Sequence, residues 1–530
     1  MATKKVYLNT IAQIAGKIST ALISIFLIKI LTNYLDVAGY GLYSKVYNYL
    51  SIFSVIADLG LYTISVREIS RYKDDEEKVK MIAGTILSIR SIMGLCIIVI
   101  SLMLGAFLPG YNTLPALVGI LIAGIFTLFG LVNSSIMSML QAFLKTEFSF
   151  VSTTVGKMVN LISMMLFVYI LYPRSEGMLG YDFAHTIMIS GVMIAGLFGN
   201  MVMTMMLYLY SRKIVKIGFR FDRTYAKHIM TASLPYGLAL FLNVLYFKVD
   251  VILLSILEPR TIADTSIALY SVPMKIVEVG MMFGTVFLNS MLPLFSEAIK
   301  KKEIPSVSPS HERGEQGMGG DGANSELFGY VAKAYKTLLI FGVGIACFLF
   351  INSSNVIIFI ASQEYIEHSK HFYTSLDAMR IVVFIFLFYF LSSLFTYLLI
   401  AHDEQKKLLR INFVITLANL AGNVLLIPYF SFVGSAGVTL VCQILLLGQT
   451  YWSTRHLIRF NFLPSFTVST LFFALIASGI NLFLLSLLHT GAFVSLTICT
   501  MVFFGVYLGG IGGMRFLANT THEAGKTSGT

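Results

Sequence analysis

The stretch YLNTIAQIAGKISTALISIFLIKILTNYLDVAGYGLYSKVYNYLSIFSVIADLGLYTISVREISR, residues 7–71, decides the fold of this chain. It covers most of two apolar runs, 6–32 and 40–66, and each exceeds the roughly 20 residues that a helix needs to cross a bilayer. The first run has no small-residue cleavage site, so it is a retained helix and not a signal peptide. The stretch therefore predicts two membrane spans joined by a short loop.

Similar runs recur to the end of the chain. Of its 530 residues, 56% are hydrophobic and 12% charged, and the mean hydropathy is +0.80. Soluble domains have about 25% charged residues. We predict an all-α, polytopic membrane protein with about fourteen transmembrane helices. The predicted spans are 6–32, 40–66, 81–108, 115–141, 151–172, 185–210, 229–257, 266–292, 335–360, 378–401, 410–430, 432–453, 467–488 and 492–513.

The distribution of basic residues predicts the orientation. With the N-terminus inside, the cytoplasmic segments hold 27 of the 38 lysines and arginines, and the outer loops hold three. This asymmetry follows the positive-inside rule, so we expect a multi-pass protein of the cytoplasmic membrane with both termini in the cytoplasm. The net charge of +11 is then a topology signal that attracts anionic lipid headgroups, and no nucleic-acid partner is expected.

No cofactor or metal is predicted. The four cysteines lie inside apolar runs and are not spaced as metal ligands. His368 and His371 form an HxxH pattern, but they lie in the charged outer loop 361–377, where a solvated loop is favoured over a metal site. The GMGGDG sequence near residue 320 lacks the preceding strand and the following GK[ST] of a phosphate loop.

A short sequence that occurs twice in similar form predicts the domain organisation. The sequence YGLYS begins at Tyr40 near the start of the second span, and IALYS begins at Ile267 near the start of the eighth. Both follow a long span and a short outer loop, which indicates two six-helix halves of the same orientation. The predicted parts are an N-terminal lobe 1–210, a linker 211–228, a C-terminal lobe 229–453 containing a flexible polar cytoplasmic loop 297–334, a terminal helix pair 454–513 and a cytoplasmic tail 514–530.

The most unusual feature is a set of cations inside the predicted spans. A cation in hydrocarbon is costly, so such residues face a protein interior or a water-filled cavity. Three acids, Asp58, Asp250 and Glu278, are the intramembrane residues of opposite charge. The excess of positive charge predicts a negatively charged cargo. The eight cations are Lys17, Lys29, Lys45, Arg90, Lys157, Lys248, Lys275 and Arg380.

Several of these cations have a second interpretation. Lys17 lies near the middle of its span, which favours the cavity. Lys45 lies near a helix end, where snorkelling to the interface is an equal alternative, and Arg90 and Lys157 are open to both interpretations. Lys275 is three residues from Glu278, so these two side chains can pair with each other.

The intramembrane acids and polar stripes are open to similar alternatives. Lys248 and Asp250 point about 200° apart on a helix and are not expected to pair. Asp250 and Asp58 are either ion or proton sites or partners of a cation on a neighbouring helix. The polar stripe on span eleven either lines a cavity or holds neighbouring helices together through hydrogen bonds. The stripes are Asn9, Gln13, Lys17, Thr20 and Ser24 on span one; Ser271, Lys275, Glu278, Thr285 and Asn289 on span eight; and Asn412, Thr416, Asn419 and Asn423 on span eleven.

The sequence resembles one membrane-protein family over nearly the whole chain. Residues 7–71 resemble the opening of the polysaccharide flippases, with an Asn-Thr, a Gly-Lys, YGLYS and ADLGL followed by REIS in nearly the family's order. These flippases belong to the multidrug/oligosaccharidyl-lipid/polysaccharide (MOP) exporter superfamily. The further similar stretches are SLPYGLALFLNVLYFKVDVILLS (233–255), ALYSVPMK (268–275), LPLFSEA (292–298) and NLAGNVLLIPYFSFVGSAGV (419–438).

This resemblance implies a lipid-linked oligosaccharide flippase with two pseudo-symmetric six-helix lobes in a V-shaped arrangement like that of the MATE transporters. Such a protein moves a polyprenyl-diphosphate-linked glycan across the membrane by alternating access. The expected partners are the lipid-linked glycan, membrane lipids and glycan-assembly enzymes, and a monomer is compatible with the sequence.

We assign the candidate site residues by their chemistry. The cations are the candidate diphosphate ligands, the amides and hydroxyl the cavity lining, and the acids the ion-coupling groups. The three sets are Lys17, Lys45, Arg90, Lys157, Lys248 and Lys275; Asn9, Gln13, Ser24, Asn412, Asn419 and Asn423; and Asp58, Asp250 and Glu278.

Three other functions compete with this prediction. A membrane polymerase or ligase of polysaccharide assembly needs catalytic groups on sizeable outer loops, whereas the outer loops here are short and carry no paired carboxylates, so we expect no enzyme. A peptidoglycan lipid-precursor flippase and a multidrug exporter belong to the same superfamily. A drug exporter for cationic compounds predicts an acidic cavity, and this chain predicts a basic one.

Overall fold

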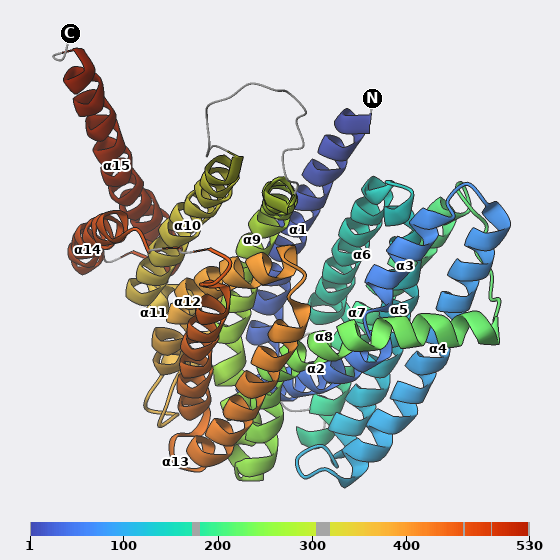
Figure 1. Cartoon of the computed structure of the whole chain (residues 1–530). Helices are drawn as coiled ribbons and strands as arrows, with labels where there is room; N and C mark the ends of the chain where they lie inside the picture. The colour runs from blue at the N-terminus through green and yellow to red at the C-terminus, as the bar shows by residue number, and fades with distance from the viewer. Residues whose placement is uncertain are drawn as a thin grey trace, which may run out of the picture. The chain divides into compact units, whose positions relative to one another are not determined.

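The computed structural model describes residues 2–171, 181–303, 319–458, 460, 462–488 and 490–527, without the side chains of residues 2–15, 17, 18, 181–185, 235, 236, 300–303, 319–325 and 515–527. Every regular element in this part of the chain is a helix, which confirms the predicted all-α class (Figure 1). The elements are α1 (Ala2–Tyr34), α2 (Val37–Asp58), α3 (Leu61–Arg71), α4 (Glu76–Phe107), α5 (Leu114–Ala142), α6 (Thr146–Leu166), the π-helical turn η1 (Phe167–Leu171), α7 (Tyr181–Ser211), α8 (Arg223–Leu257), α9 (Arg260–Glu303), α10 (Gly319–Ile351), α11 (Ser353–Ile360), the 3-10 turn η2 (Gln363–Ile366), α12 (Ser375–Ala401), α13 (Gln405–Thr454), α14 (Pro464–Leu487) and α15 (Ala492–Thr527).

Within the described residues, 12 helical segments are long and apolar enough to cross a membrane. One of them, α13, has 50 residues and covers two predicted spans, which meet at Ser431 with the non-helical angles φ 51° and ψ −143°. The first span, α1, is not among the 12, because only its residues Ser19–Tyr34 contribute a described apolar segment. Counting α1 and both limbs of α13 gives the predicted number of about fourteen.

The predicted second span is broken into α2 and α3. Leu59 and Gly60 at the break both have left-handed backbone angles, with φ of 40° and 73°. Helix α8 packs closely on the break, because a Cβ atom added to Gly237 would lie 2.5 Å from the Leu59 backbone. Only a glycine allows this approach of the two helices.

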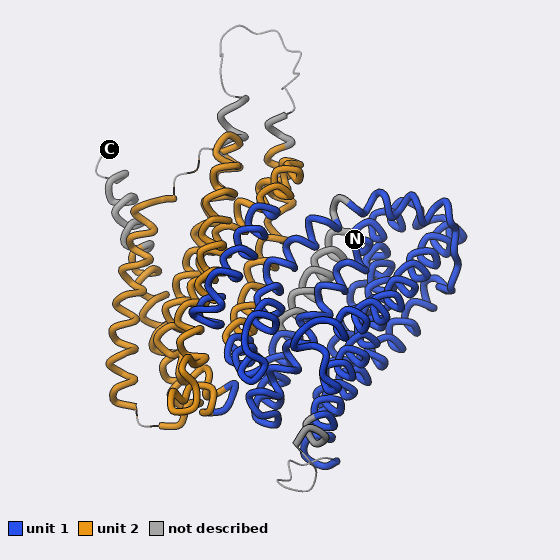
Figure 2. Tube along the Cα trace, turned by 90° about the horizontal axis from the view of Figure 1, so that it is seen from below, with its two compact units in different colours: residues 1–272, 360–362, 412–435 blue, residues 273–359, 363–411, 436–530 orange. Residues whose placement is uncertain are grey.

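The structure divides into two compact units (Figure 2). Unit 1 comprises residues 1–272, 360–362 and 412–435. In it α6 packs on α1 and α7, α5 on α4 and α7, and α8 on α2, α3 and α4. Its apolar core is built where α3, α4, α5 and α8 meet, from the buried residues Leu61, Val79, Ile82, Met139 and Ile229 among others.

Unit 2 comprises residues 273–359, 363–411 and 436–530. In it α10 packs on α12, α14 and α15, and α14 packs on α15. Asn481 ties the terminal pair to the rest of the unit: it accepts a hydrogen bond from Asn352 at 2.9 Å and donates one to the Cys499 carbonyl at 2.9 Å. Such buried amides fasten helices together in lipid.

These units are defined by packing, and the lobes predicted from the repeated short sequence stay a prediction. Two predicted linkers are partly helical. Helix α8 begins at Arg223, inside the interval 211–228. Helix α9 extends into the interval 297–334 as far as Glu303, and α10 begins inside it at Gly319. The absence of apolar periodicity did not predict these helical ends. Residues 304–318 lie outside the described part.

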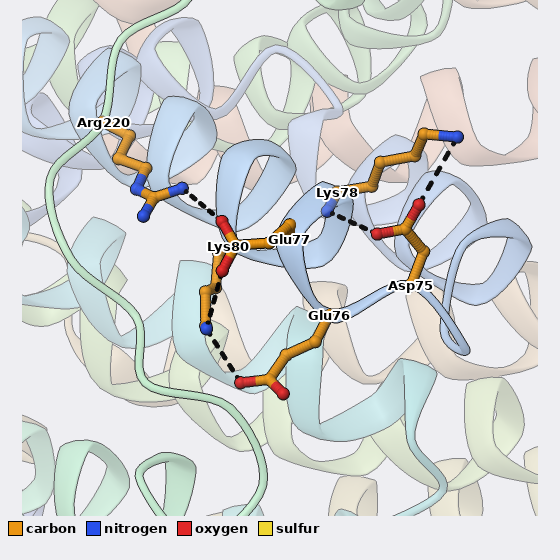
Figure 3. Close-up of polar contacts among 6 residues, drawn as sticks. All are labelled: Asp75, Glu76, Glu77, Lys78, Lys80 and Arg220. Carbon is orange, nitrogen blue, oxygen red and sulfur yellow. Dashed lines mark hydrogen bonds and ion pairs between the residues drawn. The ribbon is translucent and has the colours of Figure 1, made fainter.

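The connector before α8 lies along α4 and is held by polar contacts. Arg220 donates to Glu77 at 3.1 Å, and Lys80 donates to the same carboxylate at 2.9 Å (Figure 3). The Ser88 hydroxyl donates to the Arg220 carbonyl at 3.0 Å. The start of α8 is thereby anchored to the first turns of α4.

Candidate functional site

The polar stripe of α1 faces α6 at its described end. Ser24 accepts a hydrogen bond from the Lys157 ammonium group at 3.1 Å and donates one to the Thr20 carbonyl at 2.8 Å. Both Ser24 and Lys157 are half-buried. The side chains of Asn9, Gln13 and Lys17 lie outside the described residues. The structure thus brings together two predicted site residues from different helices.

Tyrosines of α2 lie beside this region, and sequence reasoning did not select them. Tyr43 and Tyr47 are in ring contact at 4.6 Å, and Tyr47 meets Phe126 edge to face at 5.7 Å. A Cβ atom added to Gly196 of α7 would lie 3.5 Å from the Tyr47 hydroxyl and 3.8 Å from the amide of Asn160, one turn along α6 from Lys157. The spacing of the two tyrosines by four residues was the available signal, since it places them on one helical face.

Arg90 of α4 is fully buried and ion-paired. Its guanidinium contacts the Asp58 carboxylate at the end of α2 and donates to the Ser135 hydroxyl of α5 at 3.2 Å. The structure shows Asp58 as the partner of a cation on a neighbouring helix, which is one of the two interpretations of this residue. A role of Arg90 in substrate binding, or of Asp58 in ion coupling, stays a prediction.

Lys45 of α2 is buried rather than extended toward an interface. Its side chain is 3% exposed, pairs with Asp264 at 2.5 Å and donates to the Gly110 carbonyl at 2.8 Å. The helices approach closely here, because a Cβ atom added to Gly41 would lie 1.7 Å from the Asp264 carbonyl oxygen. Lys45 therefore joins the start of α2 to the α4–α5 loop and to the start of α9.

Asp250 of α8 is the centre of a buried polar cluster. Its carboxylate accepts hydrogen bonds from the Tyr270 hydroxyl at 2.7 Å and from the Asn423 amide at 2.8 Å. The Asn423 amide nitrogen also lies 3.2 Å from the side-chain oxygen of Asn419, and Ser435 donates to the Asn423 side-chain oxygen at 2.6 Å. The structure therefore unites a predicted ion-coupling residue with two predicted lining residues. Tyr270 and Ser435 were not predicted.

The remaining predicted residues lie elsewhere. Lys275 and Glu278 pair with each other on α9 at 2.7 Å, as their spacing allowed. Farther along the same stripe, Thr285 lies 3.1 Å from the Tyr389 hydroxyl and Asn289 accepts from Tyr397 at 2.8 Å, so the stripe faces α12. Lys248 is half-buried on α8, and Asn412 is half-buried on α13, where its backbone carbonyl accepts from Thr416 at 2.7 Å.

Known proteins resemble this chain in family and in fold. Residues 6–299 match the family model described as "Polysaccharide biosynthesis protein". No curated protein matches the chain. Several solved structures share the fold at low sequence identity.

Three of these structures are a lipid flippase and two transporters. A structure of the lipid II flippase MurJ in an inward closed conformation is 14% identical, with a TM-score of 0.70 over 97% of this chain and 100% of that one. An inward-facing multidrug resistance MATE transporter of the MOP superfamily is 14% identical, with a TM-score of 0.62 over 84% and 98%. A MOP superfamily transporter from Pyrococcus furiosus, described as having a binding pocket of reversed polarity, is 14% identical, with a TM-score of 0.53 over 83% and 95%.

At this identity the structures establish the fold, and the family model establishes membership because it covers more than half of the chain. The resemblance seen in the sequence is thereby confirmed. This multi-pass membrane protein has the fold of the MOP superfamily and belongs to the polysaccharide biosynthesis protein family.

Proposed function

We propose that the protein is a flippase that moves a polyprenyl-diphosphate-linked oligosaccharide, a precursor of a cell-surface polysaccharide, across the cytoplasmic membrane by alternating access. The observation that carries the proposal is the family match together with a fold that aligns with a lipid flippase over 97% of the chain. The multidrug transporter aligns over 84%. Both termini lie in the cytoplasm in this proposal, and the protein carries out no catalysis of its own.

The Lys157 region supplies a contact for the diphosphate. An ammonium group in a half-buried position between α1 and α6 interacts with a phosphate more strongly than it would in water, because the local dielectric constant is lower. Lys17 lies seven residues before Ser24, two helical turns along the same stripe, and adds a second cation. A diphosphate then meets charge along one face of α1.

The neighbouring side chains suit a glycan. Tyr43 and Tyr47 offer an apolar ring surface with a polar end, and Asn160 offers both a donor and an acceptor of hydrogen bonds. A sugar presents apolar faces and hydroxyl groups, so this combination suits it better than a purely charged wall would.

The Asp250 cluster is the proposed ion-coupling site. The carboxylate is fully buried and accepts hydrogen bonds from Tyr270 and Asn423. A buried carboxylate gains from a proton or a bound cation, because either one removes the cost of burying its charge. Loading and release of that ion would supply free energy for a change between two conformations.

Two alternatives within the superfamily make different predictions. A peptidoglycan lipid-precursor flippase carries a similar lipid diphosphate with another glycan, and the likeness to MurJ supports that reading equally. A multidrug exporter moves apolar cations, which the lysine beside Ser24 disfavours. Glycan-assembly enzymes and membrane lipids are the proposed partners in either flippase.

Transport in vesicles tests the proposal. We would reconstitute the purified protein with a fluorescent polyprenyl-diphosphate-linked sugar and follow the fraction of label that reaches the opposite leaflet, using a membrane-impermeant quencher. We expect protein-dependent flipping that falls at least about tenfold in Lys157→Gln, since a lost charge-assisted hydrogen bond costs about 1.5–3 kcal/mol. Lys145→Gln, near the exposed start of the same helix, is the matched control and should flip normally.

Two outcomes would contradict this function. Flipping that needs the protein but not the diphosphate would show that the cargo is another lipid. Efflux of a cationic dye, with no movement of the lipid-linked sugar, would identify a multidrug exporter instead.

A further inference from the structure

A basic pocket lies where the two ends of α13 approach each other. It has a volume of about 410 Å³ and belongs wholly to unit 2. The two ends are joined by a contact of 3.2 Å between the Lys407 ammonium group and Nε2 of His456. The polar and aromatic residues that line it are Lys407, Arg410, Trp452, Ser453, Arg455 and His456.

The pocket carries an excess of positive charge. Lys407, Arg410 and Arg455 all have cationic side chains. Against them stands Glu404, which accepts from Lys407 at 2.7 Å and lies 3.8 Å from His456. The hydrogen bond from Lys407 lowers the pKa of Glu404, so this carboxylate stays ionised and offsets one cation. Arginine and lysine together are the usual ligands of a phosphate group.

Trp452 positions one of these cations. The Arg455 guanidinium lies 4.0 Å from the centroid of the Trp452 ring, a distance typical of a cation–π contact. The indole itself is 67% exposed. Tryptophan is enriched where a membrane helix meets the headgroup region, because its ring is both apolar and polar.

An exposed apolar stripe leads from the pocket along the second limb of α13. Val441, Leu445 and Trp452 recur at steps of four and seven residues, which places them on one helical face. They are 55%, 45% and 67% exposed. Gly448 lies between them and is also exposed, so no side chain projects from this point of the stripe. A free phosphate ion would gain nothing from this surface, whereas a phospholipid would use both parts.

We propose that this pocket binds the phosphate of an anionic phospholipid, with an acyl chain along the stripe of Val441, Leu445 and Trp452. Basic pockets between membrane helices on the cytoplasmic side are suited to anionic headgroups. The proposal rests on the orientation given under the proposed function, which places both ends of α13 at the cytoplasmic face.

Trp452 also reports on its own pocket, because it is the single tryptophan of the chain. We would titrate the purified full-length protein in a neutral detergent with short-chain phosphatidylglycerol and record the tryptophan emission. Parallel titrations use phosphatidylcholine of the same chain length and inorganic phosphate. We expect a saturable change with phosphatidylglycerol, which weakens as salt is added, and no comparable change with the other two.

Paired variants test the cations. Arg410→Gln with Arg455→Gln should raise the half-saturating concentration about 25-fold, since each basic residue contributes roughly fivefold at an anionic surface. Arg223→Gln with Lys227→Gln removes the same charge from exposed positions on α8 and should leave the titration unchanged. Size-exclusion elution checks folding, and Lys407→Gln replaces the double variant if that variant does not fold.

Three results would overturn the proposal. An equal response to phosphatidylcholine would show that the anion is not recognised. An equal response to inorganic phosphate would make this a free-phosphate site. An unaltered titration in a folded pocket variant would remove these cations from the site. None of these measurements involves transport, so a failure here is distinct from a failure of the flippase function.

Discussion

Two carboxylates of unit 1, Asp58 and Asp250, are given opposite surroundings by the fold. Asp58 at the end of α2 faces the buried guanidinium of Arg90, and its side chain is 24% exposed. Asp250 on α8 is fully buried and accepts hydrogen bonds from Tyr270 and Asn423. The first acid faces a fixed positive charge. The second accepts hydrogen bonds from a hydroxyl and an amide, and it is the carboxylate that we propose as the ion-coupling group.

The largest loss of stability is expected from a change at Asp58. We expect Asp58→Asn to destabilise the protein by about 3–5 kcal/mol, because it leaves the Arg90 guanidinium buried without a counter-charge. Thermal unfolding in detergent measures the loss. Replacing Asp58 and Arg90 together by leucine is the control, and it should recover much of the stability. An Asp58→Asn protein as stable as the wild type would show that the ion pair does not hold α2 to α4.

The pair of Lys45 and Asp264 should show an intermediate effect. Asp264→Asn leaves the nearly buried ammonium group with the Gly110 carbonyl and an amide oxygen as acceptors, so we expect a loss of about 1–3 kcal/mol. The same unfolding assay measures it, and the exchanged pair Lys45→Asp with Asp264→Lys tests whether the charges alone matter. A loss as large as that of Asp58→Asn would contradict the ranking by exposure, since the Asp264 side chain is 30% exposed.

Glu258, between α8 and α9, is a third carboxylate, and its contribution to stability depends on pH. Burial raises the pKa of this carboxyl, and hydrogen bonds from Ser266 and Ser431 oppose that shift. A raised pKa in the folded state means that the contribution to stability is present below the usual value of 4.5 and is lost as the pH rises through the folded value. Glu258→Gln should therefore lower the dependence of the unfolding temperature on pH above 4.5. Parallel pH profiles for both proteins would contradict this.

Asp250→Asn should have the smallest effect on stability and a large one on transport. The amide oxygen can still accept from Asn423, and the Tyr270 hydroxyl can accept from the new amide NH2, so we expect a change in stability within about 1 kcal/mol. The amide does not take up a proton or offer a charge to a cation, and ion-driven flipping should fall to the background level. Flux measured with and without an imposed ion or proton gradient separates the two effects. Full gradient dependence in Asp250→Asn would exclude this residue as the coupling group.

The two regions also show how far the sequence could predict the site. The spacing of Lys275 and Glu278 made their ion pair one of two readings, since residues three apart share a helical face. Arg90, the partner of Asp58, lies 32 residues away in the chain, and Tyr270 and Asn423, partners of Asp250, lie 20 and 173 residues away. Helical periodicity shows which face of a helix carries a polar group, but it does not show which other helix that face meets. Tyr270 and Ser435 were missed for the same reason.

The sequence by itself determined the membrane helices and the family. In hydrocarbon each backbone polar group must be satisfied within its own segment, so a long apolar run has no alternative to a helix. The tertiary structure alone decided which polar partners meet: Arg90 with Asp58, Lys45 with Asp264, and Asp250 with Tyr270 and Asn423. Lipid is as apolar as the side chains that face it, so hydropathy does not select one helix neighbour over another, and packing with a few buried polar contacts makes that choice.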